Sequence, residues 1–455
     1  MEEIHEHDSY ETAAPVSRRQ FLAGGALAAA GTVALRGNSL SRLAGLAGRA
    51  SVGRVPAGKA GTISFWDMAW GAAAYNQEGA ALVKQYNAAH PNNPAVTYQT
   101  VTWDNWYEKF AAAIASHTGP DTSSGAGYQP FQFYEAGAIE PLDTLVAQLK
   151  TSGVDQDFYI NTLELMRYQG HYIALPFAID IRVLYYRKSV LKKAGLGVPT
   201  TWDDLLTLGS ALKKRGIYLL NAAGSTPADG WQFLPIPFML GNGGGFFNAK
   251  GEPDCLSPAN VEAVEFILKL SKDGYIDPKS IDFSTTDFQS AFGSGQVALS
   301  YGTAVWAADF SPSVAADMSA TSPIKSPSGK VGTIFWVAPI MAYKGGNMTG
   351  VDDWFAAYEN LMKVYWQKGL MSLLPARKSF APVAIAKTPT ARIPLEEWLP
   401  VGKTTAASGT QLSPGLNALE GSAALGVFTQ QLIQGTSSAT SILGTLQSAV
   451  EQAMK

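Results

Sequence analysis

Cysteine and histidine, on which many metal and redox sites depend, are scarce in this sequence of 455 residues. Its one cysteine, Cys255, can form neither an intramolecular disulfide bond nor a multi-thiolate metal site. The three histidines beyond residue 50, His90, His117 and His171, belong to no metal-binding motif of the H-E-x-x-H kind. We therefore expect neither a bound metal nor another cofactor, and packing alone must stabilise the fold.

Charge is also sparse, at 16% of the residues, and 34 Lys and Arg stand against 37 Asp and Glu. A nucleic-acid-binding surface needs an excess of basic residues, which a formal net charge of −3 does not provide. The G-x-S-x-G motif of many hydrolases does not occur. A phosphate loop before Gly402-Lys403-Thr404 fails because Glu397 stands where the motif requires glycine. No nucleic-acid partner and no catalytic residues are expected.

Apolar residues, in contrast, make up 46% of the chain, which includes 11 tryptophans and 18 tyrosines. This composition excludes an intrinsically disordered protein. A length of 455 residues corresponds to two or three domains or to one large two-lobed body. The chain can therefore bury substantial cores.

The first 57 residues do not have the pattern of a folded domain. Arg18 and Arg19 precede an apolar run at residues 23–35, which Arg36 closes. This arrangement resembles a twin-arginine export signal, and the run is shorter than the roughly 20 residues that span a bilayer. The alternative is an N-terminal core helix. No cysteine follows the run directly, so we expect an extracellular or periplasmic protein without a lipid anchor, in which residues 1–57 are the export signal and a linker.

Strand and helix patterns alternate after this segment. Residues 62–66 and 95–101 have the β-branched and aromatic composition of strands, and residues 76–90 and 104–116 have helical spacing of apolar side chains. Such alternation predicts a parallel α/β sheet. Residues 170–186 form a long extended stretch that Pro176 interrupts, which favours a chain crossing between two sheets over one long central strand. Thr201, with Asp204 three residues later, predicts the start of a capped helix.

Several segments that occur in order along the chain together resemble the extracellular solute-binding proteins of sugar ABC transporters, the family that includes maltose-binding protein. The most specific segment runs from Ala174-Leu175-Pro176-Phe177 through Leu184-Tyr185-Tyr186 to Pro199-Thr200-Thr201-Trp202. The others are Ile63-Ser64-Phe65-Trp66, Gly119-Pro120-Asp121, Ile139-Glu140-Pro141-Leu142-Asp143, Phe292-Gly293-Ser294-Gly295-Gln296 and Leu374-Pro375-Ala376-Arg377.

The resemblance implies an α/β, two-lobed periplasmic-binding-protein fold, in which each lobe is a mostly parallel sheet flanked by helices. Hinge crossings near residues 177–181 and 301–303 would join the lobes. The expected N-terminal lobe comprises residues 58–178 plus 301–350, and the expected C-terminal lobe comprises residues 179–300 plus 351–455.

A sugar presents apolar C–H faces and a rim of hydroxyl groups, so its binding site needs aromatic platforms beside polar groups. Side chains at the carboxyl ends of strands and at the crossings are the candidates, because α/β folds bind ligands there. For each aromatic candidate the alternative is core packing, and for Asp180 it is a salt bridge with Arg182 or a helix cap. The expected ligand-binding residues are Trp66, Asp67, Trp70, Tyr75, Tyr128, Gln129, Asp180, Trp231, Tyr301, Trp306 and Trp354.

The sequence and the resemblance together predict a secreted, monomeric protein that is not an enzyme. It would capture a sugar or oligosaccharide in an interlobe cleft and deliver it to the permease subunits of an ABC importer. Two alternatives stay open. One is a secreted glycosidase or lyase that uses a carboxylate pair, and the other is a binding protein for a non-sugar solute such as an amino acid or a peptide.

Overall fold

The computed structural model describes residues 61–71, 73–103, 106–159, 162–225, 230–405, 416, 419 and 422–454. These residues all belong to one compact unit, Arg54–Lys455. The expected export signal at residues 1–57 lies outside them. Within the described ranges, no helix is both long enough and apolar enough to cross a membrane.

The larger of the two main sheets has the strand order β12-β7-β11-β3-β1-β2, and β4 and β13 also pair with β11. Strand β1 is parallel to β2 and β3, as the alternating pattern predicts, whereas β11 is antiparallel to β3 and β7. The strands are β1 (Thr62–Met68), β2 (Ala95–Val101), β3 (Thr122–Ser124), β4 (Ile139–Glu140), β7 (Leu175–Ile181), β11 (Thr333–Tyr343), β12 (Leu374–Pro375) and β13 (Gly402–Lys403).

Consecutive residues of β1 serve opposite faces of this sheet, because side chains alternate along a strand. Phe65 packs against Trp354 and Tyr358, which lie on α14 (Val351–Leu361), with ring centroids 5.3 and 5.1 Å away. Trp66 packs against Phe110, on α4 (Trp106–Ala115), at 5.3 Å. Helices therefore cover both faces of β1, which explains why the strand is largely apolar.

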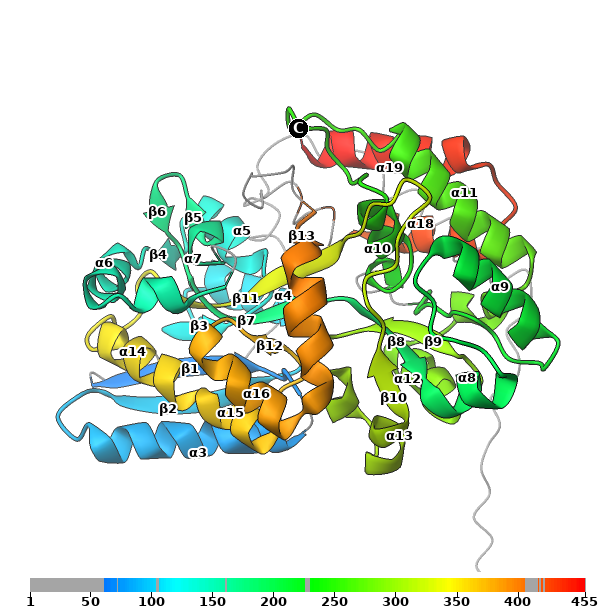
Figure 1. Cartoon of the computed structure of the whole chain (residues 1–455). Helices are drawn as coiled ribbons and strands as arrows, with labels where there is room; N and C mark the ends of the chain where they lie inside the picture. The colour runs from blue at the N-terminus through cyan, green and yellow to red at the C-terminus, as the bar shows by residue number, and fades with distance from the viewer. Residues whose placement is uncertain are drawn as a thin grey trace, which may run out of the picture. The chain divides into compact units, whose positions relative to one another are not determined.

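The remaining elements of the first lobe surround this sheet, on the left in Figure 1. Helix α3 (Ala73–Ala89) connects β1 with β2 and ends before Pro91, which cannot continue a helix. The other elements are α5 (Gln129–Glu135), α6 (Asp143–Ser152), η2 (Val154–Asp157), α7 (Thr162–Leu165), β5 (Arg167–Tyr168), β6 (His171–Tyr172), α15 (Lys363–Lys368), η6 (Lys378–Phe380) and α16 (Ala381–Lys387).

The second lobe is built on a smaller sheet with the order β10-β8-β9. Its strands, β8 (Val183–Arg187), β9 (Leu299–Gly302) and β10 (Met318–Ala320), pair antiparallel. Single parallel bridges continue it at Thr201–Lys325, Tyr218–Val297 and Leu220–Ile276. The two-lobed α/β fold is confirmed, but the expectation of mostly parallel pairing is wrong for the named strands of this lobe. Strand β8 continues from the first crossing into this lobe, and β9 and β10 run in the opposite direction on either side of it.

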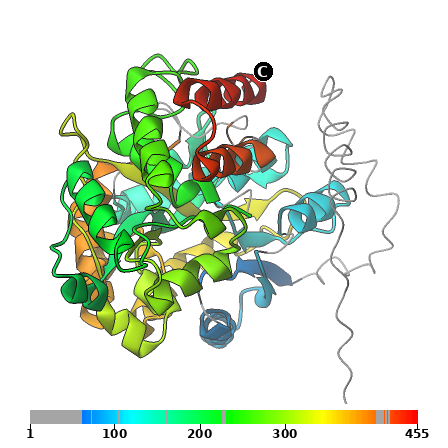
Figure 2. The same cartoon turned by 90° about the vertical axis from the view of Figure 1, so that its right-hand side faces the viewer.

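Helices flank the smaller sheet, and the two C-terminal ones, α18 (Ala423–Gln434) and α19 (Ala439–Ala453), pack against α11 (Pro258–Lys272). Figure 2 shows the red C-terminal helices beside the green segment to which α11 belongs. These elements are α8 (Lys188–Ala194), α9 (Trp202–Lys213), η3 (Gly230–Gln232), α10 (Pro235–Gly241), α11 (Pro258–Lys272), η4 (Pro278–Ile281), α12 (Thr285–Ser294), η5 (Trp306–Asp309), α13 (Pro312–Asp317), η7 (Pro389–Ala391), η8 (Pro394–Trp398), η9 (Leu399–Val401), α18 (Ala423–Gln434) and α19 (Ala439–Ala453).

The first crossing between the sheets is a single residue, Arg182, between β7 and β8. The expectation that Pro176 interrupts a strand is wrong, because this residue lies inside β7. It stands opposite Pro339 of β11, at a shift in the strand register. Two prolines that face each other have no N–H group to pair, so this position of the ladder tolerates both.

The lobe boundaries differ from the expected ones in two places. Helix α14 packs against α3 and β1 of the first lobe, whereas residues 351–455 were expected in the second. Strand β10 pairs with β8 of the second lobe, although residues 301–350 were expected in the first. Apolar side chains on α14, Trp354 above all, supply the first lobe with a cover for one face of its sheet, and this packing decides the boundary.

Candidate ligand-binding site

Four aromatic side chains form a continuous row along one edge of the larger sheet. The ring centroids of Trp70 and Trp103 lie 4.9 Å apart, those of Trp103 and Trp106 5.8 Å apart, and those of Trp106 and Tyr128 5.9 Å apart. We call these four residues the aromatic row. Each follows the carboxyl end of one of the parallel strands β1, β2 and β3. Ligands of α/β folds bind at this edge, so the row lies where a binding site is expected.

The exposure of the row differs along its length. Trp103 keeps 40% of its surface exposed and donates its indole N–H to the backbone oxygen of Ala69 at 2.8 Å. Trp70 is only 7% exposed, because it packs between Trp103 and Phe177 of β7. Trp103 is therefore the platform that a ligand can reach, and Trp70 supports it from behind.

A second group of side chains lies around the first crossing. The Arg182 guanidinium donates to both carboxylate oxygens of Asp180 and to Oε1 of Gln232. It also lies 5.1 Å from the ring centroid of Trp336, whose ring is 5.7 Å from that of Trp231. We call Asp180, Arg182, Trp231, Gln232 and Trp336 the crossing cluster. It joins β7 and β11 of the first lobe with η3 of the second.

The aromatic row and the crossing cluster adjoin each other. Gly127, the residue before Tyr128, lies so close to β11 that an added Cβ atom would stand 3.2 Å from Cβ of Trp336 and 2.9 Å from the oxygen of Val337. Glycine is therefore required for the approach of this loop. Apolar ring faces and a polar, charged group consequently border one region, as a sugar ligand requires.

Asp309, at the end of η5, adds a second carboxyl to this region. Its side chain is exposed, yet the surrounding protein raises its pKa to about 6, and the charge of Asp180 adds to the rise. Asp309 and Asp180 therefore lie close enough for their charges to interact.

Two expected ligand-binding residues, Asp67 and Tyr75, lie beneath the aromatic row. Both are completely buried, and the Tyr75 ring stacks on Tyr365 at 4.3 Å. Burial raises the pKa of the Asp67 carboxyl to about 6, although hydrogen bonds from Ser124 and Tyr98 act in the opposite direction. Neither side chain is placed to touch a ligand in this conformation.

Other expected residues pack in the cores of the lobes. Trp66 is covered by the Lys109 ammonium, 4.8 Å from its ring centroid. Trp306 stacks on Phe292, with ring centroids 4.9 Å apart. The buried side chains in this group are Trp66, Gln129, Tyr301, Trp306 and Trp354. Trp70, Tyr128, Asp180 and Trp231 are the expected residues that the structure brings together, and of these Trp231 is itself buried, with 1% of its surface exposed.

Sequence reasoning missed several members of the site, namely Trp103, Trp106, Phe177, Arg182, Gln232, Asp309 and Trp336. The signal for Trp103 and Trp106 was present, since both follow the predicted strand at 95–101 just as Trp70 follows the strand before it. No local signal identifies Trp336, which lies within β11 and meets the site only because β11 pairs with β7. Among the described side chains, no group of three or more His, Cys, Asp or Glu is placed to hold a metal ion.

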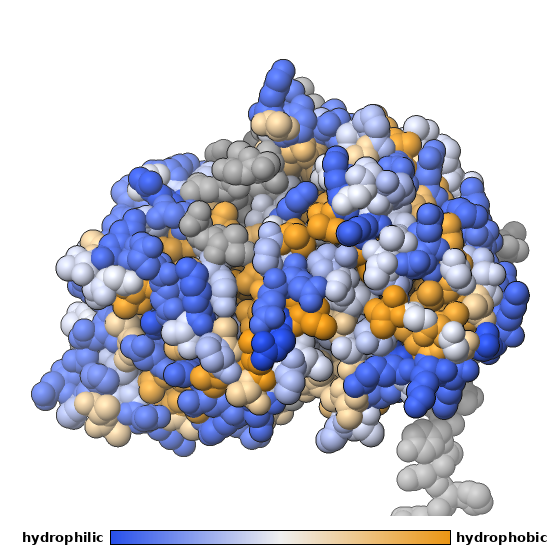
Figure 3. All heavy atoms as spheres, in the orientation of Figure 1, coloured by the Kyte–Doolittle hydropathy of each residue, from blue (hydrophilic) through white to orange (hydrophobic). Residues whose placement is uncertain are grey.

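Surface hydropathy separates the outer helices from the middle of the molecule. Figure 3 shows hydrophilic residues over the outer parts of the face that it presents and apolar atoms gathered nearer its middle.

Solved structures of other proteins have the same fold, and the similarity extends over most of this chain. A sugar transporter protein of Arthrobacter chlorophenolicus A6, solved with bound laminaribiose, is 35% identical, with a TM-score of 0.76 over 87% of this chain and 100% of that one. The GacH receptor of Streptomyces glaucescens, solved unliganded and with acarbose, is 23% identical and shows the fold, with a TM-score of 0.70 over 86% of this chain and 98% of that one.

Curated relatives match over shorter segments. A putative binding protein of Brucella abortus is 25% identical over 219 residues, 47% of this chain and 51% of that protein. The sn-glycerol-3-phosphate-binding periplasmic protein UgpB of Escherichia coli is 28% identical over 251 residues, 50% of this chain and 53% of that protein. The chain thus spans about half the length of the curated relatives it matches.

The profile of one protein family also matches most of the sequence. Residues 46–383 match the bacterial extracellular solute-binding protein family. The match covers the whole larger sheet except β13, as well as all three strands of the smaller one. The resemblance noted from the sequence motifs is therefore confirmed, and the chain belongs to the family of bacterial extracellular solute-binding proteins.

Proposed function

We propose that the protein captures a sugar or an oligosaccharide between its two lobes and delivers it to the permease of an ABC importer. The observation that carries this proposal is the aromatic row beside the crossing cluster. The exposed ring of Trp103 offers a platform to the apolar face of a pyranose, and the carboxylates of Asp180 and Asp309 accept hydrogen bonds from its hydroxyl groups.

The 35% identical relative with bound laminaribiose supports the ligand class, because its likeness extends over the whole of that chain. Laminaribiose is an uncharged disaccharide, so it needs stacking faces and hydroxyl partners and no counter-ion. Three rings of the aromatic row, Trp103, Trp106 and Tyr128, are exposed or half-buried and suit a ligand of more than one ring.

The charges of the site favour an uncharged ligand over a phosphorylated one such as the ligand of UgpB. The crossing cluster and η5 together bring two carboxyls, Asp180 and Asp309, to the region. The cation of the crossing cluster, Arg182, already donates to Asp180 and Gln232 through its terminal nitrogens. A phosphate group would meet like charges here, which opposes its binding.

The transport step follows from closure of the lobes around the ligand. The chain crosses between the sheets at Arg182 and again after β9, where the Val305 N–H donates to the Ser372 oxygen at 2.8 Å. A ligand that contacts both lobes stabilises the closed arrangement by its additional contacts. The closed protein, a monomer, would then dock on the permease, and no covalent bond of the sugar would change.

Export by the twin-arginine pathway belongs to the same proposal. The paired Arg18 and Arg19 before an apolar run support it, as does membership of an extracellular family. Because no cysteine follows the run directly, we infer that the mature protein carries no lipid anchor. Replacement of both arginines by lysine should keep the precursor in the cytoplasm, which fractionation of the producing cells would detect.

The proposal is tested by thermal unfolding of the purified protein with a panel of ligands. The panel should contain laminaribiose, other neutral disaccharides, glycerol 3-phosphate and amino acids. A neutral saccharide at 100 times its Kd should stabilise the native state by about 2.7 kcal/mol, seen as a higher Tm. Chromatography of the same mixtures should recover the saccharide unchanged.

Each other outcome would favour a specific alternative. An increase in Tm with glycerol 3-phosphate alone would contradict the proposal that the ligand is uncharged. An increase in Tm with amino acids alone would contradict the proposal that the ligand is a sugar. Consumption of the saccharide would favour a glycosidase or lyase in which Asp180 and Asp309 form the carboxylate pair. Replacement of Asp309 by Asn would then abolish turnover.

A further inference from the structure

Asp67 and Ser124 occupy a buried position directly behind the aromatic row. Asp67 is on β1 and is fully buried, and Ser124 ends β3 and is equally inaccessible. The Ser124 hydroxyl donates to Asp67 Oδ1 at 2.6 Å and accepts from the Trp70 indole Nε1 at 3.1 Å. A chain of two hydrogen bonds thus connects a buried carboxyl with one ring of the row.

The Ser124 hydroxyl uses its full hydrogen-bonding capacity. A serine hydroxyl has one donor and two acceptor sites. The donor goes to Asp67, and the acceptors receive the Trp70 indole and the backbone N–H of Met68, the latter at 2.9 Å. Because Asp67 takes the only proton of this hydroxyl, its lone pairs are directed at the two N–H groups. The indole N–H of Trp70 therefore has an acceptor whose direction Asp67 fixes.

The Asp67 carboxylate is itself held in place. Tyr98 donates its hydroxyl to Asp67 Oδ2 at 2.8 Å, and Tyr75 donates to Oδ1 at 3.4 Å. Tyr98 in turn accepts from the Asn76 amide at 2.9 Å. The carboxylate consequently has one orientation, which the packing of β2 and α3 defines.

We propose that Asp67 and Ser124 are positioning residues, which set the orientation of the Trp70 ring and, through the edge-to-face contact of Trp70 with Trp103, the platform that receives the sugar. The sequence placed Asp67 among the ligand-binding residues, whereas its burial assigns it an indirect role. This inference rests on the proposed function for its effect on affinity. Its effect on the two rings needs no ligand.

The first test is a spectroscopic double-mutant cycle on the ligand-free protein. Tryptophan is replaced by 5-fluorotryptophan, and the fluorine resonances of Trp70 and Trp103 are assigned with Trp70→Phe and Trp103→Phe. Ser124→Ala should move the Trp103 resonance in the protein with Trp70. It should leave that resonance in place in the Trp70→Phe background, since phenylalanine has no indole N–H to position.

Ser123→Ala is the matched control. Ser123 is the neighbouring buried serine of β3, and its hydroxyl is 2.9 Å from that of Tyr343, away from Asp67. Its loss should leave the Trp103 resonance unchanged. Should Ser124→Ala fail to fold, Asp67→Asn is the second variant, which retains the shape of the carboxylate and should move the resonance by the same route.

The second test measures affinity for laminaribiose, or for the neutral saccharide that raises Tm most. Ser124→Ala should raise Kd about tenfold, the equivalent of 1.4 kcal/mol, and should change Kd less than twofold in the Trp70→Phe background. Equal effects of Ser124→Ala in both backgrounds, on resonance or on Kd, would overturn the positioning role. If no saccharide binds the unaltered protein, the proposed function fails, and the resonance cycle still decides the inference.

Discussion

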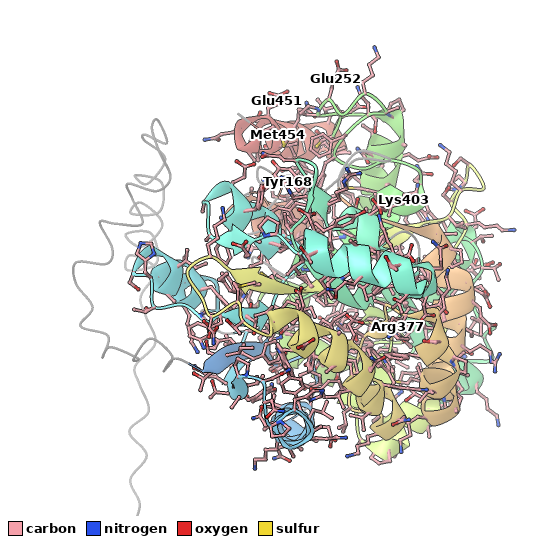
Figure 4. All side chains as sticks on the ribbon, turned by 90° about the vertical axis from the view of Figure 1, so that its left-hand side faces the viewer. Tyr168, Glu252, Arg377, Lys403, Glu451 and Met454 are labelled. Atoms are coloured by element: carbon pink, nitrogen blue, oxygen red, sulfur yellow. The ribbon has the colours of Figure 1, made fainter. Side chains whose placement is uncertain are left out.

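Glu359 is a carboxyl on α14 that the fold buries among the helices of the first lobe, with 3% of its surface exposed. Burial raises its pKa to about 8, while the positive charge of Arg377 acts in the opposite direction. Arg377, labelled in Figure 4, forms its ion pair with a different carboxylate, because its Nε donates to Asp157 Oδ2 at 2.8 Å. Glu359 is therefore protonated in the folded protein at neutral pH.

This residue gives the folded protein a pH-dependent stability. The folded state keeps the proton of Glu359 up to about pH 8, whereas the unfolded chain releases it near pH 4.5. Its contribution to stability is therefore complete below pH 4.5 and is lost as the pH rises toward 8, by a few kcal/mol over this interval. Urea unfolding between pH 6.5 and 8 should accordingly give a falling free energy of unfolding.

Glu359→Gln should remove most of this fall, because glutamine keeps the shape of the neutral acid and does not titrate. The matched control is Glu396→Gln, on an exposed side chain that pairs with Arg392. The control should retain the slope of the unaltered protein. Equal slopes for Glu359→Gln and the unaltered protein would show that Glu359 does not titrate in this range.

Individual site residues were only partly predictable from the sequence. Trp70 and Trp354 both lay in candidate positions, yet one joins the aromatic row and the other is fully buried against Phe65 and Tyr86. The rule that ligands bind at the carboxyl ends of strands identifies an edge of a sheet. The rule does not identify which side chains near that edge are covered by a helix. That depends on the packing of segments that lie far apart in the sequence.

At the scale of elements, the start of α9 shows what local chemistry can specify. Thr201 Oγ1 accepts from the Asp204 N–H at 3.1 Å, and Asp204 Oδ2 accepts from the Thr201 N–H at 3.0 Å. The capped helix start expected from the sequence is thus confirmed. Both contacts lie within four residues, so no information from elsewhere in the fold was needed.

Removal of this cap should destabilise the second lobe. We expect Thr201→Ala to lower the free energy of unfolding by about 1 kcal/mol, because it leaves an N–H at the helix start without its side-chain acceptor. Thr207→Ala is the control on the same helix. The exposed Thr207 hydroxyl binds the Asp203 carbonyl, an interaction that does not support a helix end.

Denaturant unfolding measures both variants. A loss for Thr201→Ala no larger than that for Thr207→Ala would mean that packing alone sets where α9 begins.

Strand pairing was less predictable than helix starts. The stretch 170–186 was expected to cross between two sheets, and it divides at Arg182 into β7 and β8, which pair in different sheets. The interruption was assigned to Pro176 because a proline in a central strand normally loses a hydrogen bond. In this sheet Pro176 is tolerated inside β7 because the residue opposite it on β11 is Pro339, which also lacks an N–H group. Only the identity of the partner strand shows this.

At the scale of the whole molecule, the family resemblance supplied the two-lobed fold, and long-range packing decided how the chain is divided between the lobes. The chain returns to the first lobe with β11, after it has visited the second lobe, and residues 351–387 stay in the first lobe, because α14 covers β1 and β12 pairs with β7. No composition change in the sequence marks this return. The site likewise depends on both lobes, since η3 brings Trp231 and Gln232 to the crossing.

The proposed function depends on a saccharide that lies against the ring of Trp103. Calorimetric titration of the purified protein tests this contact directly, with the neutral saccharide that gives the largest increase in Tm as the ligand. The same titration is made on Trp103→Ala and on a control, Leu256→Ala, which changes another exposed apolar side chain. We predict one binding site, an approximately tenfold higher Kd for Trp103→Ala through loss of the stacking face, and an unchanged Kd for Leu256→Ala. Equal affinities of all three proteins, or no binding of any neutral saccharide, would contradict the account.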